Sequence, residues 1–109
     1  MYYNDGDRYE GDFKNDKYEG KGIYYYNSGS RYEGDWKNDK REGKGIYYFN
    51  VAPWKGDRYE GDWKNNLKEG KGIYYYNNGD REMGDYLDDN KTGIHIKLDI
   101  NGKVTQQNY

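Results

Sequence analysis

The sequence predicts an all-β protein: an elongated, single-layer antiparallel sheet of tandem β-hairpins, solenoid-like and open at both edges. Two observations predict this fold. First, the segment Arg8–Asn15 recurs almost unchanged as Arg31–Asn38 and Arg58–Asn65, and each copy is followed at a fixed distance by Glu-Gly-Lys-Gly-Ile-Tyr-Tyr. Second, a ring or a glycine alternates with a charged residue inside each copy, which is the period of a half-buried strand. Self-similarity at a period of roughly 20 to 50 residues is typical of stacked units.

The repeated segments divide the chain into units that begin at steps of 23, 27 and 23 residues. The longer middle step contains an insertion, Val51–Trp54. Tyr2–Gly6 aligns with Tyr25–Gly29, so the chain begins inside a unit, either as a natural half-repeat or because a preceding part is missing. Terminal units are commonly atypical, because one side of them has no neighbour. The predicted organisation is a partial unit at 1–7, full units at 8–30, 31–57 and 58–80, and a degenerate fourth unit with a C-terminal cap at 81–109.

Each unit is predicted to form one hairpin. In the second unit, Tyr32–Lys37 alternates as a strand does, and Asn38–Gly43 is polar and suits the connection. Gly45–Phe49 is rich in β-branched and aromatic residues, as a returning strand is. Helix signals are absent. About nine strands, spaced ~4.8 Å apart, give a ribbon on the order of 40 Å long.

The strand glycines are predicted to lie opposite aromatic rings. We expect the first hairpin to pair Phe13 with Gly22 and Gly11 with Tyr24, and the link to the next unit to pair Gly22 with Trp36. A ring placed over a strand glycine recovers stability that the glycine forfeits. The same register fits all three copies, so the glycines are predicted to be structural.

The composition favours a folded but shallow structure. Only 32% of the residues are hydrophobic and 35% are charged, a balance that alone would indicate disorder. However, 19% are aromatic, including sixteen Tyr and three Trp, and each such side chain buries a large apolar area. We therefore expect a thin core of rings. The net charge of −2, from interspersed basic and acidic residues, gives no general attraction to nucleic acid or to an anionic membrane.

The repeated motifs resemble a known family. Tyr-Glu-Gly-Asp-Trp-Lys-Asn, then Glu-Gly-Lys-Gly-Ile-Tyr-Tyr, then Asn-Asn-Gly-Asp-Arg are similar to the membrane occupation and recognition nexus (MORN) repeat, over nearly the whole chain. The chain departs from the pattern in its long second connection and in its fourth copy. The resemblance implies an elongated, twisted, single-layer antiparallel sheet with an aromatic groove. It also implies use as a scaffold or interaction module in cytoskeletal, ciliary, membrane-junction or organelle assemblies, and some members were proposed to bind phospholipid.

Two candidate binding surfaces follow from the alternation of side chains. On one face, the groove rings are expected to form the shallow core, with edges that can contact a partner. On the other face, a contiguous apolar back stripe is expected to bind a partner or a second copy. The inserted residues Pro53 and Trp54 either cover nearby rings or dock into a partner. The groove rings are Tyr9, Phe13, Tyr24, Tyr32, Trp36, Tyr47, Tyr59, Trp63 and Tyr74, and the back stripe is Ile23, Tyr25, Ile46, Tyr48, Ile73, Tyr75, Ile96 and Leu98.

No catalytic, metal or cofactor site is predicted. Glu-Gly-Lys-Gly lacks the glycine spacing, the terminal Lys-Ser or Lys-Thr and the helix of a phosphate-binding loop. His95 is the only histidine and there is no cysteine, so no metal-ligand set forms, and we interpret His95 as a substitution tolerated at a cap. Carboxylate pairs such as Glu10 and Asp12 would need an enclosed pocket for acid–base catalysis, and on an open sheet they are expected to meet basic side chains on adjacent strands.

The predicted function is that of a non-enzymatic scaffold or protein–protein interaction module, a subunit of a larger intracellular assembly. Its partners would be other protein subunits or a second copy, and the exposed sheet edges favour such pairing, the N-terminal edge above all. The alternative is a peripheral membrane module that binds anionic phospholipid weakly through its Arg and Lys ladders. Nucleic acid is not expected as a partner. With no cysteine and no apolar signal segment, the predicted location is intracellular, cytoplasmic, cytoskeletal or organelle-associated, and not secreted.

Overall fold

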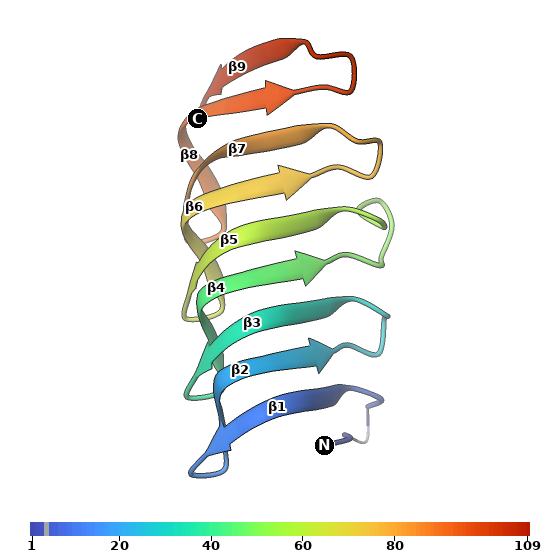
Figure 1. The fold of residues 1–109 in the computed structure, drawn as a ribbon, viewed down its shortest axis with the longest axis vertical. Helices are drawn as coiled ribbons and strands as arrows, with labels where there is room; N and C mark the ends of the chain where they lie inside the picture. Colours follow the sequence, from blue (N-terminus) through green and yellow to red (C-terminus); the bar gives the residue numbers. More distant parts are fainter. Residues whose placement is uncertain (4) are drawn as a thin grey trace.

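The computed structural model describes residues 1–3 and 5–109 and contains one open antiparallel sheet of nine strands in chain order (Figure 1). The predicted all-β, single-layer fold is confirmed. The sheet measures 46 Å along its longest axis, and the two chain ends lie at its opposite ends. The strands are β1 (Arg8–Lys14), β2 (Lys17–Tyr25), β3 (Arg31–Lys37), β4 (Lys40–Tyr48), β5 (Arg58–Lys64), β6 (Leu67–Tyr75), β7 (Arg81–Leu87), β8 (Asn90–Leu98) and β9 (Val104–Asn108).

Four two-residue turns close the first four hairpins. Both residues of every turn have positive φ, between 49° and 72°. Such turns match the twist of the flanking strands, and Asn and Asp tolerate this conformation better than other non-glycine residues do. The turns are Asn15-Asp16, Asn38-Asp39, Asn65-Asn66 and Asp88-Asp89.

Hydrogen bonds between the turn of one hairpin and the hairpin before it join each unit to the next. The side-chain oxygen Oδ1 of Asp39 accepts from the backbone N–H of Tyr18 at 2.8 Å, and Asn66 Oδ1 accepts from the N–H of Arg41 at 2.9 Å. In the same way, the carboxylate of Glu19 accepts from the backbone N–H of Asn38 at 3.0 Å. The turns therefore stack as a column along one side of the sheet.

The predicted register is wrong by two residues. Tyr9 lies opposite Tyr24 and Gly11 lies opposite Gly22, and an irregularity then places Phe13 opposite Tyr18. The prediction took the whole polar segment after the first strand as the connection. The turn in fact has only two residues, and turn length fixes the register. The even shift leaves every side chain on its predicted face.

The links between units are shifted in the same sense. Gly22 lies opposite Gly34 and Tyr24 lies opposite Tyr32, so Trp36 faces Gly20 and not Gly22. Paired glycines thus run across the middle of the sheet, where the predicted register had a ring opposite each one.

Aromatic rings nevertheless cover the strand glycines, but they reach them diagonally. A side chain added at Gly22 would overlap the ring of Tyr9, and one added at Gly45 would overlap Tyr32. Tyr9 and Tyr32 are fully buried as a result. The hydroxyl of Tyr9 donates to the backbone carbonyl of Asp12 at 2.9 Å, and this pins the ring over the glycines.

The N-terminal residues pair with the beginning of β1. The amino group of Met1 donates to the carbonyl of Tyr9 at 2.8 Å, and Met1 accepts from the N–H of Tyr9 at 2.9 Å. Tyr2 forms a bridge with Arg8. The N-terminal edge is therefore closed at the start of β1.

Candidate functional site

The aromatic face of the sheet, which carries the predicted groove rings, is a continuous core that crosses the units. Tyr9 meets Trp36 edge-on with ring centroids 5.6 Å apart, and Tyr32 meets Trp63 in the same way at 5.3 Å. The indole N–H of Trp36 donates to the carbonyl of Gly22 in the preceding unit, at 3.1 Å. These contacts hold neighbouring units together.

The predicted groove rings fall into two groups by exposure. Buried rings cannot touch a partner, so their place is in the core. Phe13 lies in the edge strand β1, where its side chain is 46% exposed. The buried rings are Tyr9, Tyr32, Trp36, Tyr59 and Trp63, and the half-buried rings, whose edges are accessible, are Tyr24, Tyr47 and Tyr74.

Further rings, which were not among the predicted groove rings, pack against this core. Tyr26, Phe49 and Tyr76 follow the second strand of the first three units, and the third ring of the Tyr-Tyr-Tyr or Tyr-Tyr-Phe motif was the available signal. The ring of Tyr26 packs at a tilt between those of Tyr24 and Tyr47, with centroid distances of 4.7 and 5.7 Å. The accessible aromatic surface is therefore wider than predicted.

A second missed feature is the residue at the second position of each even-numbered strand, which points into the aromatic face. Tyr18 stacks on Tyr9 at a centroid distance of 3.8 Å. In the next units this position is Arg41, Lys68 and Lys91. Sequence analysis had assigned these residues to the polar connection, so their place among the rings became visible only with the observed register.

The polar groups at the ends of these side chains are mostly paired. The guanidinium of Arg41 lies 4.7 Å from the centroid of Trp63 and donates to the carbonyl of Asn66 at 2.7 Å. Lys91 Nζ lies 3.0 Å from a carboxylate oxygen of Glu82. Burial lowers the pKa of Lys68, and the positive charges of Lys91 and Arg41 lower it further, against the raising effect of Asp89.

The fourth unit replaces both members of the ring–glycine pair. Glu82 stands where the other units have a buried tyrosine, and His95 stands where they have a glycine. His95 is 1% exposed, and its ring lies over Gly84. Its Nε2 donates to the carbonyl of Asp85 at 2.8 Å, the bond that Tyr9 makes to Asp12. Our interpretation of His95 as a tolerated substitution is therefore wrong, because its ring occupies the place of the missing tyrosine.

Glu82 is the centre of a buried polar cluster in this unit. His95 Nδ1 lies 2.9 Å from Glu82 Oε2, and the hydroxyl of Tyr76 donates to Glu82 Oε1 at 3.1 Å. Burial acts to raise the pKa of Glu82, but the hydrogen bond and charge of Lys91, together with Tyr76 and His95, lower it below its ordinary value.

The back face is not the contiguous apolar stripe that we predicted. Ile46 lies between Glu33 and Glu60 on the adjacent strands, and the other isoleucines of the first units have equivalent neighbours. The series of residues that lie opposite one another across the strands becomes apolar only from Ile73 onward, where Met83 is the next member. The prediction failed because the isoleucines come from every second strand and the strands between them supply glutamate.

The tyrosines of the back face alternate with arginines. The guanidinium of Arg31 lies 3.8 Å from the ring centroid of Tyr48, and Arg58 lies 3.8 Å from Tyr75. In the first three units the arginine also pairs with the glutamate two residues on, as Arg58 does with Glu60 at 3.4 Å. All eight predicted back-stripe residues are half-buried on this face: Ile23, Tyr25, Ile46, Tyr48, Ile73, Tyr75, Ile96 and Leu98.

A hollow of about 780 Å³ lies on the back face, over the second to fourth units. Its floor is glycine backbone, and Ile46, Ile73 and Met83 give it apolar walls. Its basic rim residues are paired: Lys44 with Asp62, and Lys71 with Asp85 at 3.6 Å. Glu33 and Glu60 also line the hollow, and they pair with Arg31 and Arg58. The hollow therefore combines apolar walls with charged groups that are paired with one another.

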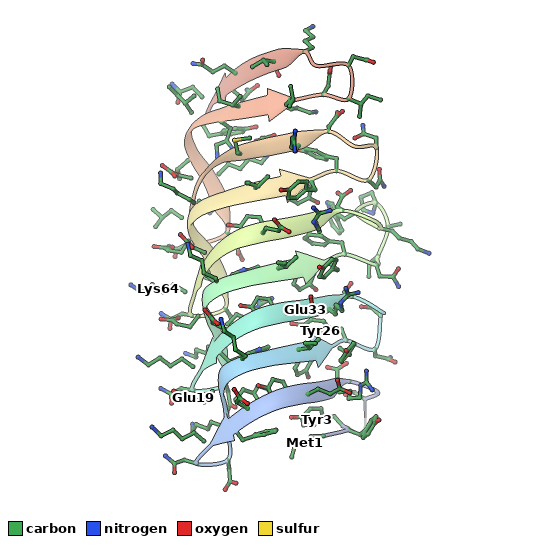
Figure 2. All side chains as sticks on the ribbon, viewed as in Figure 1. Met1, Tyr3, Glu19, Tyr26, Glu33 and Lys64 are labelled. Carbon is green, nitrogen blue, oxygen red and sulfur yellow. The ribbon has the colours of Figure 1, made fainter. Side chains whose placement is uncertain are left out.

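A row of exposed lysines follows the hairpin turns. Figure 2 shows Lys64 projecting outward on this side of the sheet. Among residues 1–3 and 5–109, no carboxylate oxygen lies within ion-pair distance of these lysines, in contrast to Lys21, Lys44 and Lys71 on the strands. The Lys ladder of the membrane alternative, Lys14, Lys37 and Lys64, belongs to this row. The row consists of Lys14, Lys17, Lys37, Lys40 and Lys64.

The long connection after β4 carries Pro53 and Trp54 outside the strands. Trp54 is 51% exposed and lines a pocket of about 240 Å³ together with Lys68, Tyr74 and Tyr86. The insertion thus extends to the aromatic face, beside the half-buried rings.

Within the described part of the chain, no three His, Cys, Asp or Glu side chains are grouped to hold a metal ion. That same part contains no helix long and apolar enough to cross a membrane.

Comparison with protein-family models gives one match, a model described as MORN repeat, at residues 9–31, 32–50 and 59–81. These segments cover more than half of the chain. Comparison with curated proteins gives no match.

Proposed function

Because the chain belongs to the MORN repeat family, whose members are non-catalytic modules that generally interact with proteins or membranes, we propose that it is a non-enzymatic scaffold that binds a protein partner. It would serve as a subunit of a larger intracellular assembly, cytoskeletal, ciliary or organellar. A repeat array suits this role, because stacked units create one extended surface.

The back-face hollow is the observation that carries this proposal. Apolar side chains that lie among charged groups paired within the chain offer a protein partner apolar contacts and leave few free charges to desolvate. The occupant we propose is a protein segment that presents apolar side chains to Ile46, Ile73 and Met83. The rim lysines Lys44 and Lys71 are already neutralised by aspartates, which favours a protein segment over a lipid headgroup.

The experiment is chemical cross-linking of the native assembly, followed by measurement of binding between the purified chain and the partner it identifies. Combined Ile46→Thr and Ile73→Thr exchange should weaken binding at least about tenfold, since apolar anchors dominate interface energetics. The circular dichroism spectrum should stay unchanged. Ile23→Thr is the matched control, because Ile23 lies on the same face but outside the hollow. Unaltered binding by the double variant would contradict the proposal.

Binding of anionic phospholipid is the second candidate, and the row of turn lysines favours it. Each exposed lysine near an anionic membrane contributes about 1 kcal/mol, and this attraction falls with ionic strength. Flotation with phosphatidylserine vesicles should then show binding that weakens between low and physiological salt and is reduced by Lys37→Gln with Lys64→Gln. Flotation that these changes leave intact would exclude the lysine row as a membrane contact.

A further inference from the structure

Lys68 differs from its three counterparts in the other units. The hydroxyl of Tyr18 bonds to that of Tyr3, Arg41 donates to a backbone carbonyl, and Lys91 pairs with Glu82. Lys68 Nζ has no hydrogen bond and no carboxylate oxygen within 4.0 Å in the part of the chain that the structure describes. An ammonium group has three donors, and half-buried charges are normally paired.

Aromatic rings surround this ammonium. Its nitrogen lies 5.1 Å from the ring centroid of Tyr59, 5.6 Å from Tyr86 and 5.8 Å from Tyr74. Contacts of a cation with ring faces contribute about 0.5 to 2 kcal/mol, which keeps the charge tolerable in the free protein. They satisfy none of its hydrogen-bond donors.

Lys68 lines the pocket of about 240 Å³ that Trp54 borders. Tyr86 also lines this pocket; its side chain is 4% exposed, and its hydroxyl is buried without a hydrogen-bond partner. Two side chains whose polar groups lack partners, Lys68 and Tyr86, therefore line one pocket. The tryptophan beside them comes from the insertion that distinguishes the second connection from the others.

The fourth unit shows which group fits a lysine in this position. There, a carboxylate oxygen of Glu82 lies 3.0 Å from Lys91 Nζ, and the hydroxyl of Tyr76 donates to the other oxygen at 3.1 Å. In the third unit Tyr59 occupies the position of Glu82, so the chain supplies no carboxylate to Lys68. A partner can supply it.

We propose that the pocket between Trp54, Lys68 and Tyr86 binds a carboxylate carried by a protein segment, with an apolar or aromatic neighbour of that carboxylate against Trp54. This inference rests on the proposed protein-binding function and adds a second contact on the opposite face of the sheet. The carboxylate is an aspartate or glutamate side chain or a C-terminus.

The charges around the pocket favour a single negative charge over a phosphate dianion. The pocket is lined by Lys68 and Lys91, but also by Asp57 and Asp89. Asp57 already accepts from Tyr74 at 2.6 Å, and Asp89 from the backbone of Lys68 at 2.7 Å. Both aspartates would repel a doubly charged ligand, and they repel a carboxylate less.

The test is selection of peptides from a random displayed library on the full chain and on its Lys68→Tyr variant. The chain tolerates a tyrosine at this position, because Tyr18 occupies the equivalent position in the first unit and stacks on Tyr9. Peptides selected on the wild-type chain should carry an acidic group beside an aromatic residue. They should bind Lys68→Tyr at least about tenfold more weakly, because the carboxylate of the bound peptide then lacks the ammonium group of Lys68. Tyr86→Phe should weaken binding about fivefold without lowering the melting temperature.

Lys64→Tyr is the matched control, the same exchange at an exposed lysine, and should bind like the wild type. Loss of binding when a peptide's C-terminus is amidated assigns the carboxylate to the C-terminus. Loss on glutamate-to-glutamine exchange assigns it to a side chain, and either result supports the site. Displacement of the peptide by inorganic phosphate more readily than by acetate would overturn the assignment.

The remaining outcomes separate the two proposals. Peptides that bind the wild-type chain and Lys68→Tyr equally well would overturn this site and leave the proposed function standing. A library that yields no peptide on either protein would contradict both.

Discussion

The third and fourth units build the same layer with different residues. In the third, the ring of Tyr59 crosses from β5 and lies over Gly72 of β6. In the fourth, the ring comes from the returning strand, as His95 of β8, and lies over Gly84 of β7. Each hairpin therefore needs one ring over one strand glycine, and either of its two strands can supply the ring.

Introducing the glutamate and histidine of the fourth unit into the third unit should give the largest effect on stability. Gly72→His alone should cost about 3 kcal/mol, because the new ring overlaps Tyr59, and Tyr59→Glu alone about 3 to 5 kcal/mol, because it empties the core. If either strand can supply the ring, the double variant should recover at least about 2 kcal/mol of this loss. Urea denaturation of the four proteins measures the coupling. Additive losses would show that the fourth unit depends on neighbours that the third lacks.

Removal of the histidine ring should be the next largest effect. His95→Ala deletes a buried ring and leaves the carboxylate of Glu82 without one of its contacts, so we expect a loss of about 2 to 4 kcal/mol. Hydrogen exchange should accelerate in β7, β8 and β9 and stay unchanged in β1 and β2. Uniform acceleration along the sheet would instead indicate that the nine strands unfold as one.

Trp63→Phe sharpens the contrast between inner units and the first unit. The exchange keeps a ring but removes the bond from the indole N–H to Gly45, which is 3.2 Å long. Phe13 in the edge strand has no such bond. We expect a loss of about 1 kcal/mol from the bond, measured as a lower urea midpoint. An unchanged midpoint would assign the cohesion between units to ring packing alone.

The pH dependence of stability should differ between the units. Burial raises the pKa of Tyr9 to about 12 and that of Tyr59 above its ordinary value, so the stability they contribute is lost as the pH rises above the ordinary pKa of a tyrosine. The pKa of Glu82 is lowered, so its contribution is present above the ordinary pKa of a glutamate and is lost as the pH falls through the lowered value.

Hydrogen exchange at both extremes of pH measures this difference. Acid should loosen β7 and β8, where Glu82 lies, whereas alkali should loosen every unit that holds a buried tyrosine, including β7 with Tyr86, whose pKa burial raises to about 12. Glu82→Gln serves as the control that removes the acid effect. Acid loosening that persists in this variant would assign the effect to other carboxylates.

The sequence determined the sheet and its two faces, because a period of two assigns every side chain to a face whatever the register. It did not reveal the register, because the two-residue turns at Asn15-Asp16 and Asn38-Asp39 look like part of a longer polar connection. For the same reason Lys68 was assigned to that connection and not to the aromatic face. The sequence also did not show that the ring of His95 takes the place of the tyrosine that Glu82 replaces. That relation depends on a diagonal contact between strands, which appears only in the folded chain.

Each of the three junctions between units has a turn that accepts a hydrogen bond from the hairpin before it. At the first two junctions, an indole also donates to a glycine carbonyl of the preceding unit. A whole hairpin could therefore be added or removed in evolution, and the surfaces brought together would already match. Each such event changes the length by two strand spacings, about 10 Å. Duplication or loss of a hairpin would thus change the reach of the sheet in equal steps, with no new junction to be evolved.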